Sequence, residues 1–191
     1  MVTGEDIVKE LTRLGLPPDA DEGNLLLPDE AALMSQLAIE TKDNLAVELG
    51  TFAGYSAVLM GYTRCLVKGQ PIVTVDNGQI EGCLDIAQER VTDFQLENYV
   101  KFITANSSDT DKVMPELRGY GQIGLLFIDA GHTYDAVVAD FNAYRGKLAK
   151  GAYVAFHDYT RIAGVRSAIK DLMLEVTVVE NTAVCRWGIL S

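Results

Sequence analysis

A strand-turn-helix pattern at residues 45–56 constrains the fold of this chain more than any other segment. Residues 45–49 form a short apolar run interrupted only by Glu48, which is typical of a parallel strand covered on both faces. Gly50 and Gly54 permit a tight turn into a helix and remove side chains that would keep a ligand from the backbone. The free N–H groups at the start of that helix would face the ligand. Because the spacing is G-x-x-x-G and not G-x-G-x-x-G, a pyrophosphate is not the first ligand that we expect.

The remainder of the chain alternates strand-like and helix-like segments, which predicts a doubly wound α/β sheet flanked by helices. Strands are predicted at residues 45–49, 72–75, 100–104, 124–128 and 152–156, and helices at residues 54–67, 81–97, 109–118, 134–148 and 165–172. The last two strand-like segments, residues 174–179 and 183–190, are separated by three residues, too few for a crossover helix. We therefore predict that they form an antiparallel hairpin.

The first 42 residues are predicted to form a helical cap. Residues 5–14 and 28–41 have helical patterns and are joined by a loop at residues 15–27. We expect this cap to shape a substrate entrance on a ligand-binding α/β core at residues 43–191. The full length of 191 residues fits one domain, so a single domain is predicted.

Charge and composition exclude several functions. The net charge of −11 would repel a phosphate backbone and no Lys/Arg cluster offsets it, so nucleic acid is not an expected partner. No apolar run is long enough to cross a membrane, and the first 15 residues have an amphipathic pattern unlike a signal peptide. We expect a cytoplasmic protein whose three scattered cysteines are reduced.

Polar residues follow the apolar strands, where ligands collect in an open parallel sheet. Asp76, at the end of the second strand, is placed to accept hydrogen bonds from the hydroxyls of a ribose. Asn106, Ser107 and Ser108 follow the third strand and offer neutral donors and acceptors suited to the edge of an adenine.

Both histidines of the chain, His132 and His157, are predicted to meet Asp129 and Asp158 at neighbouring strand ends. An acid directly after the fourth strand is costly to place without a partner, which favours a functional role for Asp129. Two roles stay open: a divalent cation held by Asp129 and Asp158 with His157, or general base catalysis by His132 or His157. The structural alternative for Asp158 is a helix cap near Arg161.

With these residues assembled, the chain resembles the class I S-adenosylmethionine-dependent methyltransferases from residue 44 onward. Within them it is similar to the small O-methyltransferases of the catechol type and of the macrocin or cephalosporin-biosynthetic type. Residues 48–56 (E-L-G-T-F-A-G-Y-S) resemble the first motif of the family, and Asp76 matches its ribose-binding acid. Residues 127–134 (F-I-D-A-G-H-T-Y) resemble its F-I-D-G-D-H-S-Y, and residues 155–159 its A-F-H-D-Y.

The resemblance implies a Rossmann-like sheet of order 3-2-1-4-5-7-6 with an antiparallel seventh strand. It implies S-adenosylmethionine as cofactor, a small hydroxylated acceptor, magnesium or another divalent cation, and a homodimer. The resulting cofactor residues are Glu48, Gly50, Thr51, Phe52, Gly54, Tyr55, Ser56, Asp76, Asn77, Asn106, Ser107, Ser108 and Asp129. The catalytic candidates are Asp129, His132 and His157, and the metal candidates are Asp129, His157 and Asp158. His157 replaces an acid or amide of the family, and Gly131 stands where a second aspartate is common.

Two other functions are considered. A nicotinamide-dependent oxidoreductase would share the doubly wound sheet and the acid after the second strand, but the G-x-G-x-x-G motif is missing and the terminal hairpin does not fit. A non-catalytic accessory protein would bind the cofactor without turning it over. Tyr55, Tyr134 and Tyr159 are expected to line an aromatic or sugar pocket.

Overall fold

A seven-stranded sheet organises the computed structural model, which describes residues 2–18 and 26–188. The strands are β1 (Leu45–Leu49), β2 (Ile72–Asp76), β3 (Val100–Thr104), β4 (Ile123–Ile128), β5 (Leu148–Phe156), β6 (Thr177–Val179) and β7 (Thr182–Arg186). Their order is β3-β2-β1-β4-β5-β7-β6, and β7 pairs antiparallel with both β5 and β6. The other pairs are parallel. The implied sheet order and the antiparallel seventh strand are therefore confirmed.

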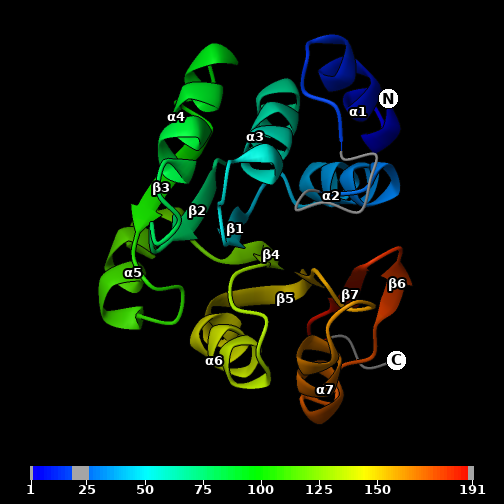
Figure 1. The fold of residues 1–191 in the computed structure, drawn as a ribbon, viewed down its shortest axis with the longest axis vertical. Helices are drawn as coiled ribbons and strands as arrows, with labels where there is room; N and C mark the ends of the chain where they lie inside the picture. Colours follow the sequence, from blue (N-terminus) through cyan, green and yellow to red (C-terminus); the bar gives the residue numbers. More distant parts are fainter. Residues whose placement is uncertain (1, 19–25, 189–191) are drawn as a thin grey trace.

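Helices cover both faces of the sheet (Figure 1). One face carries α1 (Gly4–Arg13), α2 (Pro28–Glu40), α3 (Tyr55–Val67) and α4 (Cys83–Asp93), and the other carries α5 (Thr110–Glu116), α6 (Tyr134–Tyr144) and α7 (Ala163–Asp171). Because side chains alternate across the pleat, Leu45, Val47 and Leu49 enter the core under α5–α7, whereas Ala46 enters the core under α1–α4. Within the described residues, no helix combines the length and the apolar character that a membrane span requires.

The two predicted N-terminal helices are present and pack against each other and against α3. Thr3 caps α1, since its Oγ accepts the N–H of Asp6 and the Asp6 carboxylate accepts the N–H of Thr3. Pro28 opens α2, where its fixed φ and missing N–H suit the first helical turn. Of the predicted loop at residues 15–27, residues 19–25 lie outside the described part of the chain.

Two predicted helices are too long because left-handed residues flank the first and a short 3₁₀ turn follows the second. α4 starts only after Gly82, with φ 77°, and Gln95, with φ 56°, follows its end, so it does not fill residues 81–97. α6 stops at Tyr144 and a 3₁₀ turn (Arg145–Lys147) leads directly into β5, where residues 145–148 were predicted to be helical.

The C-terminal hairpin is present as predicted, with a tighter turn. Thr182 pairs with Val179, so only Glu180 and Asn181 form the turn. Residues 174–176 and 187–188 are not part of the strands, and residues 189–190 of the predicted last strand lie outside the described residues.

Candidate active site

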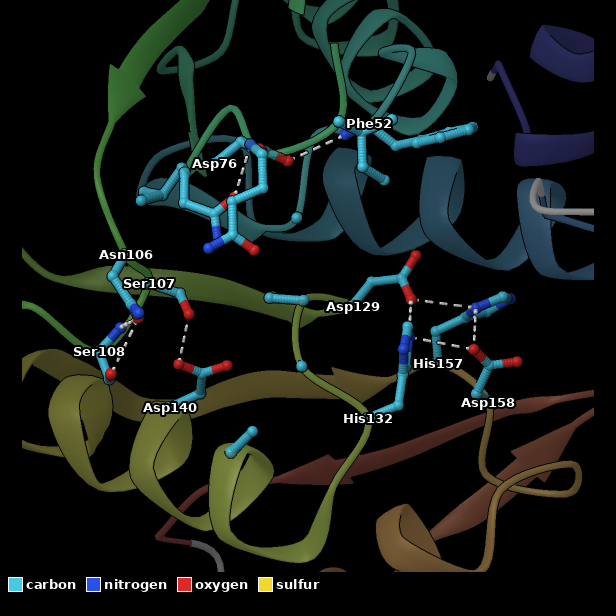
Figure 2. A pocket seen from close by; sticks show the side chains of 18 of the residues that line it. Phe52, Asp76, Asn106, Ser107, Ser108, Asp129, His132, Asp140, His157 and Asp158 are labelled. Atoms are coloured by element: carbon cyan, nitrogen blue, oxygen red, sulfur yellow. Dashed lines mark hydrogen bonds and ion pairs between the residues drawn. The ribbon is translucent and has the colours of Figure 1, made fainter. Parts of the chain in front are cut away.

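A cleft of about 780 Å³ lies at the carboxyl ends of the parallel strands. Polar side chains gather on its two sides (Figure 2). One side, named here the Asp76 end, contains Asp76, Asn106, Ser107, Ser108 and Asp140; the other, named the Asp129 end, contains Asp129, His132, His157 and Asp158. The strand-end residues that the sequence indicated are therefore brought to one cleft from different strands.

Not all predicted site residues reach the cleft. Those lining it are Gly50, Phe52, Asp76, Asn77, Asn106, Ser107, Ser108, Asp129, His132, His157 and Asp158. Glu48, Thr51, Gly54, Tyr55 and Ser56 are not among its lining residues and belong to β1, the following loop and the start of α3. The cleft is also lined by residues that the sequence analysis did not predict to be in the site: Gln79, Ile80, Cys83, Asp140, Arg161 and Ile162.

The two glycines of the first motif allow close approach of neighbouring backbone. Gly50 has φ +94°, and a Cβ there would lie 2.2 Å from the carbonyl oxygen of Asp129. Gly54 has φ +80°, and a Cβ there would lie 2.6 Å from Cβ of Ala87 in α4. Gly54 thus serves the packing of α4, while Gly50 brings the loop after β1 against the end of β4.

Asp76 holds the glycine-containing loop from the next strand. Its Oδ2 accepts the N–H groups of Thr51 and Phe52 at 2.9 and 3.2 Å, and its Oδ1 accepts the N–H of Gly78 at 2.8 Å. Phe52 has φ 47°, a left-handed conformation that is costly for a bulky residue and that these bonds help to hold. Three of the four lone-pair positions of the carboxylate are thus used, and Oδ1 keeps one for a ligand.

Glu48 is linked to the same loop through the hydroxyl of Thr74. Thr74 Oγ donates to Glu48 Oε2 at 2.6 Å, and the hydroxyls of Thr74 and Thr51 are hydrogen-bonded to each other. Complete burial raises the pKa of Glu48 to about 8, so the carboxyl is largely neutral at pH 7. This residue acts inside the protein and not on the cleft surface.

Asp140 of α6 completes the Asp76 end. It is 2% exposed, its Oδ1 accepts Ser107 Oγ at 2.6 Å, and its Oδ2 has no partner among the described residues. Burial raises its pKa to about 6. One turn later, the Tyr144 hydroxyl donates to the Ser107 carbonyl at 2.8 Å. The sequence could have indicated a role for Asp140, because it shares the buried face of α6 with Val137 and Phe141. A carboxylate on such a face is costly to bury without a partner.

Four side chains form an alternating charge cluster at the Asp129 end (Figure 2). Asp129 Oδ1 lies 3.4 Å from His132 Nε2 and 3.2 Å from His157 Nδ1. Asp158 Oδ2 lies 3.1 Å from His132 Nε2 and 3.7 Å from His157 Nδ1. Asp129 is therefore paired with both histidines, which offsets the cost of placing a carboxylate directly after the buried strand β4.

The two histidines of this cluster differ in exposure and protonation. The side chain of His132 is 42% exposed and that of His157 is 5% exposed. Burial lowers the pKa of His157, but its ion pairs with Asp129, Asp158 and Glu30 outweigh this and raise it to about 12. The bond to Asp129 also raises the pKa of His132. The bond from His157 lowers the pKa of Asp158 to about 2.

The residues suited to a divalent cation are not quite those predicted. Asp129, His132 and Asp158 each offer a ligand atom, and these atoms lie within 4.8 Å of one another. His157 is not in this set: its side chain is 5% exposed and its Nε2 lies 3.5 Å from Glu30 Oε2. The set thus contains His132 where the prediction has His157, whose role as a ligand stays a prediction, and its mixed oxygen and nitrogen donors suit a transition metal better than magnesium.

Several other expectations are corrected by the geometry. Asp158 does not cap α7, which starts at Ala163 after Ile162 and has no side-chain cap. Tyr55, Tyr134 and Tyr159 do not line the cleft: the first is buried, the second is exposed with its hydroxyl on Asp171, and the third packs on the core. No described residue of the N-terminal helices lines the cleft either.

Comparisons with known proteins agree with this architecture. A protein of Acanthamoeba polyphaga mimivirus described as uncharacterized is 34% identical over 121 residues, which cover 62% of this chain and 53% of that protein. The chain thus spans about half the length of the curated relative that it matches.

Solved methyltransferases have the same fold. The O-methyltransferase from Bacillus cereus in complex with SAH has a TM-score of 0.68 and 18% identity, covering 95% of this chain and 89% of that one. CalS11, a TDP-rhamnose 3′-O-methyltransferase of calicheamicin biosynthesis, has a TM-score of 0.68 and 16% identity, covering 82% and 76%. These identities show likeness of fold.

A family model described as a methyltransferase domain matches residues 47–159, which run from β1 to just beyond β5. These matches lend no support to a nicotinamide-dependent oxidoreductase or to a non-catalytic accessory protein. Since the match spans more than half of its 191 residues, this chain belongs to the methyltransferase domain family.

Proposed function

We propose that this protein is an S-adenosylmethionine-dependent O-methyltransferase that acts on a small hydroxylated acceptor. The observation that carries the proposal is the cluster of Asp129, His132, His157 and Asp158 at one end of a cleft, in a chain of the methyltransferase domain family. The names of CalS11 and of the Bacillus cereus protein, both O-methyltransferases, support the same reaction class.

The Asp76 end has the chemistry needed for the adenosyl part of the cofactor. Its volume is within the range of roughly 300–1,000 Å³ that small-molecule sites occupy. Asp76 Oδ1 offers a lone pair for a ribose hydroxyl, and Asn106 and Ser108 offer neutral groups suited to an adenine edge. Asp140 holds Ser107 at this end of the cleft through a hydrogen bond of 2.6 Å. When bound, the cofactor supplies an electrophilic methyl group.

The Asp129 end would orient and deprotonate the acceptor. Orientation of the acceptor oxygen against the methyl group accounts for most of the expected acceleration. His132 is the stronger candidate for the general base because it is partly exposed in the cleft, whereas His157 is buried and held as a cation. The carboxylates of Asp129 and Asp158 stabilise the positive charge that His132 acquires on taking the proton.

A divalent cation is the second way to activate the acceptor hydroxyl. If one binds, Asp129, His132 and Asp158 would hold it and lower the pKa of that hydroxyl. His132 would then be occupied as a ligand, so the two roles are distinguished by whether removal of divalent ions abolishes turnover. A homodimer and a cytoplasmic location remain predictions, to be measured by sedimentation and by cell fractionation.

Calorimetry with S-adenosylhomocysteine, with NAD as comparator and Asp76→Ala as control, is the first test. Saturable binding that is lost in Asp76→Ala supports the proposal, while binding of NAD alone overturns it. Transfer of a labelled methyl group to a panel of sugars, catechols and other hydroxylated compounds follows, with chelator and with added Mn²⁺ or Mg²⁺. Binding of S-adenosylhomocysteine without transfer to any acceptor would instead support an accessory role.

A further inference from the structure

Glu30 of α2 is a fully buried acid that reaches the Asp129 end from behind. Its exposed fraction is 0%, although it belongs to the first turn of a helix near the N-terminus. Oε2 accepts the N–H of Leu27 at 2.9 Å and lies 3.5 Å from Nε2 of His157. Oε1 accepts the N–H of Asn181 at 2.9 Å and the hydroxyl of Thr182 at 2.8 Å.

Asn181, in the β6–β7 turn, connects Glu30 to the segment that carries Asp158. Its Nδ2 donates to Asp158 Oδ1 at 2.8 Å, and its Oδ1 accepts the N–H groups of Thr160 and Arg161 at 3.0 and 3.2 Å. Its backbone carbonyl accepts a further N–H from the same segment. His157 and Asp158, which follow β5, are thus each contacted by a residue that does not line the cleft: His157 by Glu30 and Asp158 by Asn181.

A helix cap alone does not account for this arrangement. One of the contacts of Glu30, the N–H of Leu27, closes the start of α2, and a capping acid of that kind has no need to be buried. Burial of a carboxylate is costly unless every lone pair finds a partner. Here the remaining contacts of Glu30 lead to His157 and to the hairpin turn next to Asp158.

We propose that Glu30 is a positioning residue for the Asp129 end: it keeps the His157 ring with Nδ1 toward Asp129 and Asp158, and through Asn181 it anchors the segment carrying Asp158. The inference goes beyond the proposed function and rests on it only for the effect on turnover. It gives the N-terminal helices a part in the site other than shaping an entrance.

The orientation of the His157 ring can be followed directly because the chain has only two histidines. Imidazole ¹⁵N signals are recorded for the wild-type protein and assigned with His132→Asn. Glu30→Gln keeps the size of the side chain but places a neutral amide against Nε2 of His157, and the His157 signals are expected to shift. Thr182→Val is the matched control, since it removes one hydrogen bond of Glu30 and leaves the charged partner of His157 Nε2 and the bond from Asn181 to Asp158 in place.

The two variants are expected to separate positioning from folding. Glu30→Gln should lower kcat by about 10- to 100-fold, the range typical of residues that orient active groups, with the affinity for S-adenosylhomocysteine unchanged. Thr182→Val should lower the melting temperature and leave kcat and the His157 signals near wild type. His157 signals at wild-type positions in Glu30→Gln, or equal shifts in Thr182→Val, would overturn the proposal.

Asn181→Asp decides the question if Glu30→Gln does not fold. It retains the acceptor for Thr160 and Arg161 but turns the donor facing Asp158 into a carboxylate oxygen. We expect the His132 signals to shift, because His132 Nε2 lies 3.1 Å from Asp158, and unmoved His132 signals would overturn the proposal. The ring signals need no acceptor, so failure of this inference is distinct from failure of the proposed function.

Discussion

Nε2 of His132 lies 3.1 Å from Oδ2 of Asp158, although the two residues follow different strands of the sheet. The same nitrogen lies 3.4 Å from Oδ1 of Asp129. Both histidines line the cleft, but the His132 side chain is 42% exposed and that of His157 only 5%, so His132 is the more accessible to a ligand there. This relationship separates the roles of two histidines that the sequence treats as equivalent.

His132→Ala is expected to slow methyl transfer without weakening cofactor binding. Loss of a general base lowers turnover by about 10²- to 10⁴-fold, and His132 is on the opposite side of the cleft from Asp76. Single-turnover methyl transfer and calorimetry with S-adenosylhomocysteine measure the two effects. A weakened cofactor affinity in His132→Ala, equal to that of Asp76→Ala, would contradict this division of roles.

Glu48→Gln is expected to change how stability depends on pH. The pKa of Glu48 is raised from 4.5 to about 8, so the folded protein retains a proton that the unfolded chain loses in this interval. This contribution to stability is fully present below pH 4.5 and is lost as the pH rises through about 8. Glutamine remains neutral, so urea unfolding at pH 5 and pH 9 should show a smaller pH-dependent loss in the variant. An unchanged pH dependence would mean that Glu48 is already ionised in the folded state.

Gly50→Ala is expected to destabilise the protein by about 1–3 kcal/mol from backbone strain alone, because Gly50 has φ +94°. The added Cβ would also press on the carbonyl of Asp129. The matched control is Gly119→Ala, whose Cβ would meet no atom within 4 Å. Chemical denaturation of both variants tests the prediction, and equal stabilities would show that the loop after β1 can move away from Asp129.

Asp140→Ala is expected to weaken binding of S-adenosylhomocysteine by about 10- to 100-fold. The change removes the charge-assisted bond to Ser107, worth about 1.5–3 kcal/mol, and loosens the loop after β3. Tyr144→Phe, which removes one neutral bond to the same residue, should have a smaller effect on affinity. Calorimetry on both variants provides the comparison. Wild-type affinity in Asp140→Ala would show that the loop after β3 does not contribute to cofactor binding.

Much of the fold was predictable because its signals are local. Short apolar runs with glycines between them gave β1 through β5, and the short link before Thr182 required a hairpin. Helix ends were less predictable. For example, Gln95, just after the end of α4, takes a left-handed conformation although it is not a residue type typical of such turns. The course from Tyr144 into β5 likewise depends on pairing with β4, which is a contact between distant segments.

By itself, the sequence determined which residues follow the strands, and hence that Asp76, Asp129, His132 and Asp158 meet at one edge of the sheet. Parallel strands end at the same edge, so this follows from strand order and spacing. Only the tertiary structure decided that His157 is buried while His132 is partly exposed, and that Glu30 contacts Asn181 151 residues later in the chain. These outcomes depend on which side chains are packed away from water and on which charges must then be paired, and no local pattern encodes either.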